Sequence, residues 1–364
     1  MELNKWPISL FMDKRLISLF TESARIKYFW IFLTAKCNLR CNYCFFKCYT
    51  NKTSVTASSI KLLIQAFPRL MDAEFVISGG EPLMDWKNTS KLITFLRSFK
   101  DKYILLQTNG TLLNKAKIAF LKDHRVGLEL GIDGDLSSMK KHRIGINNYF
   151  PNLLKNIQLA RLKNIDLFTT MTVLPKTANQ MYKNYIFLKD IGIKKIEVTP
   201  AAFSKWTISA TEAFKNNYIK IIKFASKSRC LNSLSTGYDT PLPYPMVDFI
   251  YLPDHTVLTN WALLSSPLRS IAKYTMFRTN KQRITLNKRF DPSLLYDYIS
   301  FFQNNKTPTY RDFSNLNARR IFIELYKKSS WQYWQNYEQL GDFLKKTNQN
   351  VIILKRNRYD QNGR

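Results

Sequence analysis

The first half of the chain alternates between short apolar runs and segments in which apolar positions recur at helical spacing. Runs rich in β-branched and aromatic residues predict strands, and the recurring spacing predicts amphipathic helices. The expected strands cover 28–34, 74–77, 103–107, 127–132, 166–173 and 194–198. The expected helices cover 57–70, 86–99, 114–121, 151–162 and 178–189.

This regular alternation predicts an α/β fold with a parallel sheet and helical crossovers. The units are too few to close an eight-fold barrel, so a partial (βα)6 TIM-like barrel or an open doubly wound sheet fits the pattern. In either architecture the active site belongs at the carboxyl ends of the strands.

The rhythm changes after Thr199. We expect a helix over 211–226, a small hairpin over 249–252 and 256–258, and a mostly helical extension over 292–354. The expected division is an N-terminal segment (1–27), the partial barrel (28–205) and a C-terminal substrate or cap region (206–364).

Charge adds little to this picture. The formal net charge is +30 over 364 residues, but the basic excess is spread over both halves of the chain. Evenly spread charge attracts nucleic acid weakly and non-specifically, and it does not form a surface for specific recognition. Nucleic acid is therefore not the favoured partner. No apolar run reaches membrane-spanning length, and the opening residues lack a signal-peptide pattern. We therefore expect a cytoplasmic protein without membrane association.

Four of the five cysteines lie close together, directly after the first expected strand. Cys37, Cys41 and Cys44 have the spacing C-x3-C-x2-C, with the aromatic Tyr43 before the last of them. Three thiolates can hold three irons of a [4Fe–4S] cluster, which usually takes four cysteines, and leave one iron open. Structural zinc is the alternative, but it needs a fourth close ligand.

Three further short motifs follow the next three expected strands. They are the segments 78–82 (Ser-Gly-Gly-Glu-Pro), 108–110 (Thr-Asn-Gly) and 131–134 (Gly-Ile-Asp-Gly), the last with Arg143 ten residues beyond Asp133. Together with the cysteine motif, this ordered set resembles the radical S-adenosylmethionine (radical SAM) superfamily. It is most similar to the peptide- and protein-modifying, maturase-like branch, without that branch's auxiliary-cluster cysteines.

The resemblance implies one [4Fe–4S] cluster on Cys37, Cys41 and Cys44, with S-adenosylmethionine bound to the open iron. Reductive cleavage of that cofactor would give a 5′-deoxyadenosyl radical that abstracts a hydrogen atom from the substrate. The resemblance also implies a set of cofactor-binding residues: Tyr43, Gly79, Gly80, Glu81, Pro82, Asn109, Asp133, Arg143 and Val198.

Within that set the resemblance assigns distinct tasks. The segment from Gly79 to Glu81 would hold the methionine amine, and Arg143 would pair with the methionine carboxylate. Asn109 and Asp133 would bind ribose or order the loops, and the backbone near Val198 would pass the adenine. Two positions depart from the family pattern: Gly131 stands where a serine is usual, and Met139 where a histidine is frequent.

Two cysteines remain outside the motif. Cys48 fits a bystander, because a fourth ligand would close the open iron. Cys230 has two interpretations, an inert thiol or the hydrogen donor that some radical SAM peptide epimerases place in their C-terminal part. The stretch 249–261 looks either like a degenerate auxiliary-cluster hairpin or like an ordinary hairpin.

The resemblance also sets expectations for partners. We expect a peptide or protein substrate and an acidic electron donor such as flavodoxin or ferredoxin, for which the basic surface is suited. Two alternatives stay open: a radical SAM enzyme that acts on a small molecule or RNA, and a cluster-binding protein without turnover.

Overall fold

The computed structural model describes a set of segments that includes most of the predicted barrel, 28–205. These segments are 28–44, 46, 49, 53–99, 102–201, 204–227, 234–235, 248–258, 275–280, 283–286, 336, 339–344 and 346–347. Cys48, Cys230, the N-terminal segment 1–27 and most of the expected helical extension lie outside the described residues.

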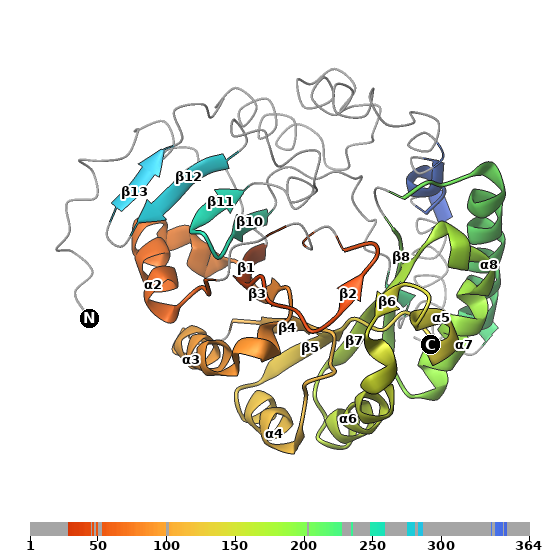
Figure 1. The fold of residues 1–364 in the computed structure, drawn as a ribbon, viewed down its shortest axis with the longest axis horizontal. Helices are drawn as coiled ribbons and strands as arrows, with labels where there is room; N and C mark the ends of the chain where they lie inside the picture. The colour runs from red at the N-terminus through yellow and green to blue at the C-terminus, as the bar shows by residue number, and fades with distance from the viewer. Residues whose placement is uncertain are drawn as a thin grey trace, which may run out of the picture.

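All six predicted strands are present and pair in parallel. They lie side by side in chain order on the inner side of an arc of helices (Figure 1). This confirms the partial TIM-like barrel. The strands are β1 (Tyr28–Thr34), β3 (Glu74–Gly79), β4 (Ile104–Thr108), β5 (Val126–Leu130), β7 (Leu167–Val173) and β8 (Lys195–Pro200).

The main helices follow the strands and form the outer layer of the arc (Figure 1). They are α2 (Ala57–Ala66), α3 (Trp86–Arg97), α4 (Lys115–Asp123), α6 (Phe150–Leu162), α7 (Met181–Asp190) and α8 (Ile208–Lys227). The prediction of one helix over 57–70 was wrong at its end, because Pro68 restarts the chain as the short 3-10 helix η4 (Pro68–Asp72). Proline disfavours helical backbone at the residue before it, here Phe67.

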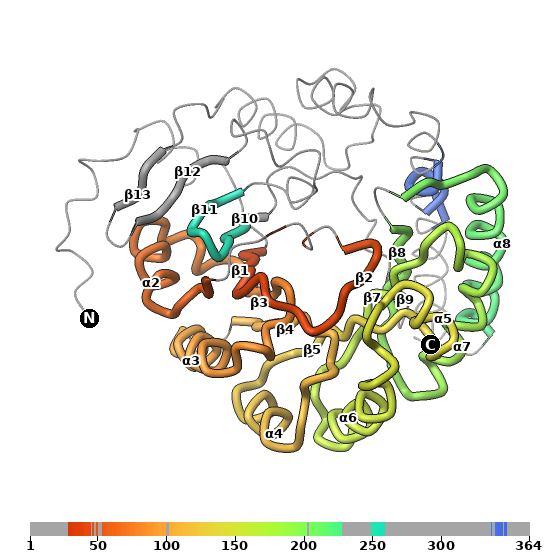
Figure 2. The backbone as a smooth tube through the Cα atoms, in the orientation of Figure 1, coloured from red at the N-terminus to blue at the C-terminus, as the bar shows by residue number. Residues whose placement is uncertain are grey.

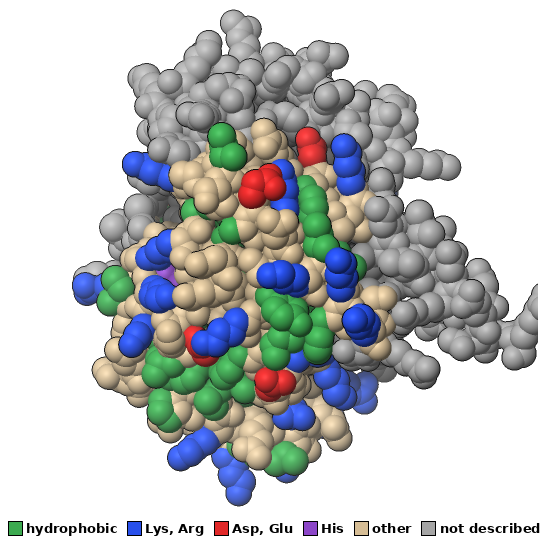
Figure 3. Space-filling view, turned by 90° about the vertical axis from the view of Figure 1, so that its right-hand side faces the viewer, with side chains coloured by type: hydrophobic (Ala, Val, Ile, Leu, Met, Phe, Trp, Pro, Cys, Tyr) green, Lys and Arg blue, Asp and Glu red, His purple; other side chains and the backbone are tan. Residues whose placement is uncertain are grey.

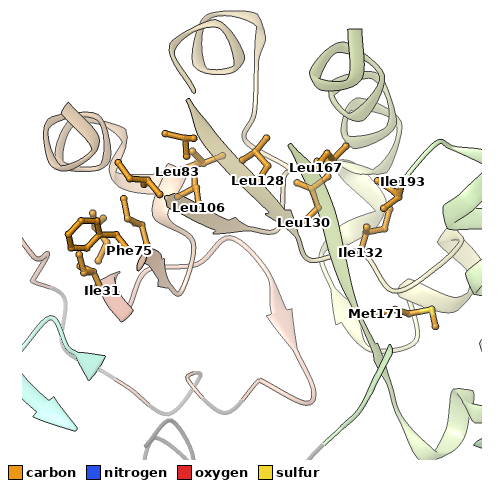
Figure 4. Packing of buried hydrophobic residues seen from close by; sticks show 14 of the residues in the cluster. Ile31, Phe75, Leu83, Leu106, Leu128, Leu130, Ile132, Leu167, Met171 and Ile193 are labelled. Carbon is orange, nitrogen blue, oxygen red and sulfur yellow. The ribbon is translucent and has the colours of Figure 1, made fainter. Parts of the chain in front are cut away.

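The two faces of the sheet differ in chemistry. Residues such as Leu106, Leu128 and Leu130 have no exposed surface and point toward the helices, where they form the main core (Figure 4). Successive side chains of a strand point to opposite faces. Gln107, which follows Leu106, and Glu129, which lies between Leu128 and Leu130, therefore face the concave side of the barrel.

The sheet extends at both edges beyond the six barrel strands, partly through strands that were not predicted. β9 (Leu234–Ser235) pairs with β8, and β10 (Asp248–Tyr251) returns to pair in parallel with β1. The predicted hairpin is confirmed as β10 with β11 (Thr256–Leu258), and the sheet continues through β12 (Thr275–Asn280) and β13 (Arg283–Leu286). The described residues of the expected helical extension, 336, 339–344 and 346–347, are helical. No described helix combines the length and apolarity of a membrane span.

Candidate functional site

The segment 35–44, here the cysteine loop, leaves the end of β1 and crosses the concave side of the barrel (Figure 2). Its middle forms β2 (Arg40–Cys41). Cys37 is exposed, Cys41 and Cys44 are half-buried, and none of the three forms a disulfide. Partial burial raises the pKa of the Cys41 thiol, and the nearby Arg143 guanidinium opposes that rise. Among the described residues, no three Cys, His, Asp or Glu side chains converge closely enough to hold a single metal ion.

The Cys37 end of the loop is held against the end of β3 by backbone contacts. The amide of Gly80 donates to the Thr34 carbonyl at 2.7 Å, and the amide of Glu81 donates to the Lys36 carbonyl at 2.7 Å. A Cβ at Gly80 would lie 2.4 Å from the Lys36 carbonyl oxygen. At Gly79, which has a φ of +137°, a Cβ would lie 2.5 Å from the Thr34 oxygen. Both positions need glycine because the loop backbone passes so close.

Glu81 extends this contact to the next strand. Its carboxylate has no exposed surface and accepts from the Thr108 hydroxyl at 2.7 Å and from the Asn109 amide at 2.7 Å. It also accepts from the amide of Leu83 at 2.9 Å. Burial raises the pKa of Glu81, and these three hydrogen bonds work against the rise. Glu81 therefore fixes the end of β4 relative to the end of β3.

Asn109 completes the connection back to the loop. Its side-chain amide donates to Asn38 Oδ1 at 2.9 Å and lies 3.9 Å from Cys37 Sγ. Its Oδ1 accepts from the Thr111 amide at 2.9 Å. We call the group Gly80, Glu81, Asn109 and Asn38 the amide anchor, because hydrogen bonds from amide groups connect it to the Cys37 end of the loop.

The Cys41 end of the loop is held by ions instead. Asp133, at the end of β5, is 2% exposed and accepts from Arg143 Nε at 2.6 Å and Arg143 Nη2 at 3.0 Å. The same carboxylate contacts His142 Nε2 at 2.8 Å and accepts from the Tyr43 hydroxyl at 2.9 Å and the Thr172 amide at 2.9 Å. We call Asp133, Arg143, His142 and Tyr43 the ionic anchor.

These contacts decide the charge of the carboxyl group. Burial alone would raise the pKa of Asp133, but the Arg143 guanidinium and the hydrogen bonds from His142 and Arg143 hold it well below its ordinary value. Asp133 is therefore ionised across the physiological range.

A two-stranded ladder connects this anchor to the loop. β2 pairs with β6 (Arg143–Ile144), which places Cys41 opposite Arg143. Arg143 Nη1 lies 4.0 Å from Cys41 Sγ, and its guanidinium carbon lies 5.4 Å from the centre of the Tyr43 ring. A Cβ at Gly131 would lie 3.0 Å from Arg143 Nη1. The departure from serine at position 131 thus leaves room for the guanidinium.

The structure brings most of the residues expected at the site together around the cysteine loop. Pro82 lies nearby but begins the short 3-10 helix η5 (Pro82–Asp85), where its carbonyl accepts from the Thr89 hydroxyl at 2.7 Å. The Val198 side chain is buried in the core, so β8 could meet a ligand there only through its backbone. Cys230, the expected hydrogen donor, lies outside the described residues.

Sequence reasoning missed the contributions of Asn38, His142 and Thr172. Asn38 lies inside the cysteine motif, and its signal was its amide side chain between two cysteines. His142 is the neighbour of Arg143, but the turn that carries it back to Asp133 left no sequence signature. Thr172 contributes only its backbone amide, which no residue type could reveal.

Comparisons with known proteins agree with this geometry. Residues 31–188 match the family model of the Radical SAM superfamily. The Cysteine-type anaerobic sulfatase-maturating enzyme of Clostridium novyi (strain NT) is 26% identical over 183 residues, which cover 46% of this chain and 49% of the relative. The GTP 3′,8-cyclase of Pasteurella multocida (strain Pm70) is 29% identical over 140 residues, which cover 37% of this chain and 41% of the relative. The matches thus span less than half the length of either curated relative.

The fold has known relatives as well. The structure of native anSMEcpe with bound AdoMet superposes with a TM-score of 0.64 at 16% identity, over 91% of this chain and 99% of that one. The Radical SAM family, whose model residues 31–188 match, implies a [4Fe–4S] cluster and S-adenosylmethionine. The donor set fits such a group. Three cysteine side chains outside any disulfide lie on one loop, and side-chain N–H groups of Asn109 and Arg143 lie near two of the sulfurs.

Proposed function

We propose that this chain is a radical SAM enzyme in which Cys37, Cys41 and Cys44 hold a [4Fe–4S] cluster with one open iron. The observation that supports this most strongly is the double attachment of the cysteine loop. The ends of β3 and β4 hold it near Cys37, and the end of β5 holds it near Cys41. Every motif in the set contributes to one of the two anchors, which chance occurrence of the motifs would not produce.

The contacts suggest how the remaining residues share the work. Arg143 binds Asp133 through Nε and Nη2, which leaves Nη1 and the outer edge of Nη2 for a cofactor carboxylate. Asp133 would act mainly by orienting Arg143, and a hydrogen bond to ribose remains a prediction. The backbone of Gly79 and Gly80 would line the amine side of the cofactor, and Glu81 would hold that backbone in place.

Other predicted residues would act around this centre. Asn109 would order the loop beside Cys37, and Tyr43 would keep Asp133 and Arg143 together. Pro82 would fix the backbone direction after Gly79 and Gly80, and the backbone near Val198 would lie beside the adenine. When bound, the cluster and S-adenosylmethionine supply a 5′-deoxyadenosyl radical that removes a hydrogen atom from the substrate.

The proposed substrate is a peptide or protein. The named relatives include sulfatase-maturating enzymes, and anSMEcpe is also known with a bound peptide. The proposed electron donor is an acidic protein of the flavodoxin or ferredoxin type. Lysine and arginine side chains are dispersed over the described part of one face (Figure 3), and the chain carries a net charge of +30. Such a surface attracts acidic partners.

A small-molecule substrate is the second candidate, because GTP 3′,8-cyclases are also among the similar proteins. A short peptide gene beside the gene of this protein would favour the peptide. Cleavage of the cofactor stimulated by a nucleotide but not by peptides would favour the small molecule.

The test of the central proposal is anaerobic reconstitution with iron and sulfide. We expect iron and sulfide near four per chain, and release of 5′-deoxyadenosine when dithionite and S-adenosylmethionine are added. The control is a chain with Cys37, Cys41 and Cys44 all replaced by alanine, which should retain neither iron nor sulfide. Retention of the cluster by that variant would refute the ligand assignment, and a reducible cluster that never cleaves the cofactor would support the binding protein instead.

A further inference from the structure

The concave face of the barrel carries a chain of hydrogen-bonded polar side chains from four neighbouring strands. The Ser78 hydroxyl on β3 donates to Gln107 Oε1 on β4 at 2.7 Å, and Gln107 Nε2 donates to Glu129 Oε2 on β5 at 2.6 Å. From the other side, the Thr170 hydroxyl on β7 donates to Glu129 Oε1 at 2.7 Å. The chain therefore converges on one carboxylate.

Within the described part of the chain, Glu129 has no cationic partner. Its contacts are the two hydrogen bonds from Gln107 and Thr170, and no lysine, arginine or histidine of the described residues pairs with it. Its position deep in the fold raises its pKa, and the two hydrogen bonds oppose that rise. The residue as a whole is nevertheless half-buried rather than fully enclosed. Asp133, four residues further along the chain, is paired with the Arg143 guanidinium, so the two buried carboxyl groups differ in this respect.

A second polar group on the same face also lacks a partner. Trp30 lies on β1 between Phe29 and Ile31, which face the helices, so its indole faces the concave side. Trp30 Nε1 is buried and has no hydrogen-bond partner among the residues that the structure describes. A buried indole N–H is normally hydrogen-bonded, because burial without an acceptor is energetically unfavourable. As far as the chain is described, the face thus carries one carboxyl group without a cationic partner and one buried indole N–H without an acceptor.

We infer that the concave face binds a peptide that bears a basic side chain, with its ammonium or guanidinium group against Glu129. The indole N–H of Trp30 is buried, so it becomes available to a backbone carbonyl of such a peptide only if its side chain turns, and Glu129 carries the inference. This inference rests on the proposed function and makes its substrate class specific. The net charge of +30 would repel a cationic side chain of the peptide, and a carboxyl group inside the barrel offsets that repulsion. This explains why so basic a chain keeps Glu129 there without a cation of its own among the described residues.

The test is peptide binding measured by equilibrium dialysis, at fixed ionic strength, on reconstituted full-length protein with S-adenosylmethionine and without reductant. The probes are three pentapeptides with acetylated N-termini and amidated C-termini. Their central residue is lysine, arginine or norleucine, and the other four residues are glycine. We expect the lysine and arginine peptides to bind about tenfold more tightly than the norleucine peptide. Glu129→Gln should reduce this preference to within about twofold, because it keeps the shape and removes the charge.

Two further variants make the result decisive. Glu212→Gln removes the same charge from the exposed side of α8 and should keep the full preference. Glu129→Asp keeps the charge and should keep part of the preference for basic peptides. This variant therefore separates loss of charge from disturbed folding. Equal binding of all three peptides by the unmodified chain, no binding of any peptide, or an unchanged preference in Glu129→Gln would each overturn the inference. Because no turnover is involved, these outcomes are independent of whether the cofactor is cleaved.

Discussion

The two ends of the cysteine loop are held by different physical means. At the Cys37 end, the amide anchor consists of close backbone packing and hydrogen bonds, with Glu81 enclosed by three donors. At the Cys41 end, the ionic anchor gathers Arg143, His142 and Tyr43 around the buried charge of Asp133. The first depends on shape and should respond mainly to added volume. The second depends on charge, so removal of one ion leaves the others buried without compensation.

The largest expected effect comes from Asp133→Asn. The variant leaves the Arg143 guanidinium buried without its anion, so we expect the free energy of unfolding to fall by about 3–5 kcal/mol. Urea unfolding of the full chain measures it. The matched control is Asp135→Asn, since Asp135 pairs with Lys183, whose side chain is 73% exposed. We expect that control to change stability by less than about 1 kcal/mol. Equal effects of the two changes would remove the distinction between the anchors.

A smaller effect is expected at the amide anchor from Gly80→Ala. The added Cβ would lie 2.4 Å from the Lys36 carbonyl oxygen and 2.8 Å from that of Ala35, and neither backbone atom can move without shifting the loop. We expect a loss of about 1–3 kcal/mol together with reduced iron content after reconstitution. The control is Gly341→Ala, because nothing lies within 4 Å of that Cβ position. Normal iron content in Gly80→Ala would show that the loop tolerates displacement.

The smallest effect is the acid response of the ionic anchor. The pKa of Asp133 is lowered in the folded state, so its contribution to stability is complete above the ordinary pKa of about 4 and declines as the pH falls below it. The decline approaches about 1.4 kcal/mol per pH unit. Asp133→Asn lacks this group. The stability difference between the unmodified chain and the variant should therefore stay constant from about pH 7 to 5 and shrink below about pH 4. A difference independent of pH would mean that Asp133 is not the charge on which the anchor depends.

The barrel strands were predictable because each one carries a buried apolar run. In β5, for example, Val126, Leu128 and Leu130 are all buried, and such an apolar run is visible without knowledge of the rest of the fold. The order of the motifs along the chain then placed them at one edge of the sheet, since parallel strands end on the same side. The fold class and the cysteine motif were accessible for this reason.

The details of the site depended on contacts that sequence does not record. The sequence suggests that Glu81 binds a cation, but in the structure its carboxylate accepts hydrogen bonds from Thr108, Asn109 and Leu83. The glycines at 79 and 80 read as room for a cofactor, and the structure shows that they also make room for the loop backbone. The pairing of Arg40 and Cys41 with 143–144 involves strands of two residues, too short for any periodic pattern.

The return of β10 to β1 has a practical consequence for work with fragments. β1 is flanked by β3 on one side and by residues 248–251 on the other, more than two hundred positions further along the chain. A fragment that ends at residue 205 would leave a row of unsatisfied N–H and C=O groups along the strand that leads into the cysteine loop. Such a row is a template for pairing with another chain, so the excised barrel should self-associate, and self-association could be mistaken for a biological oligomer.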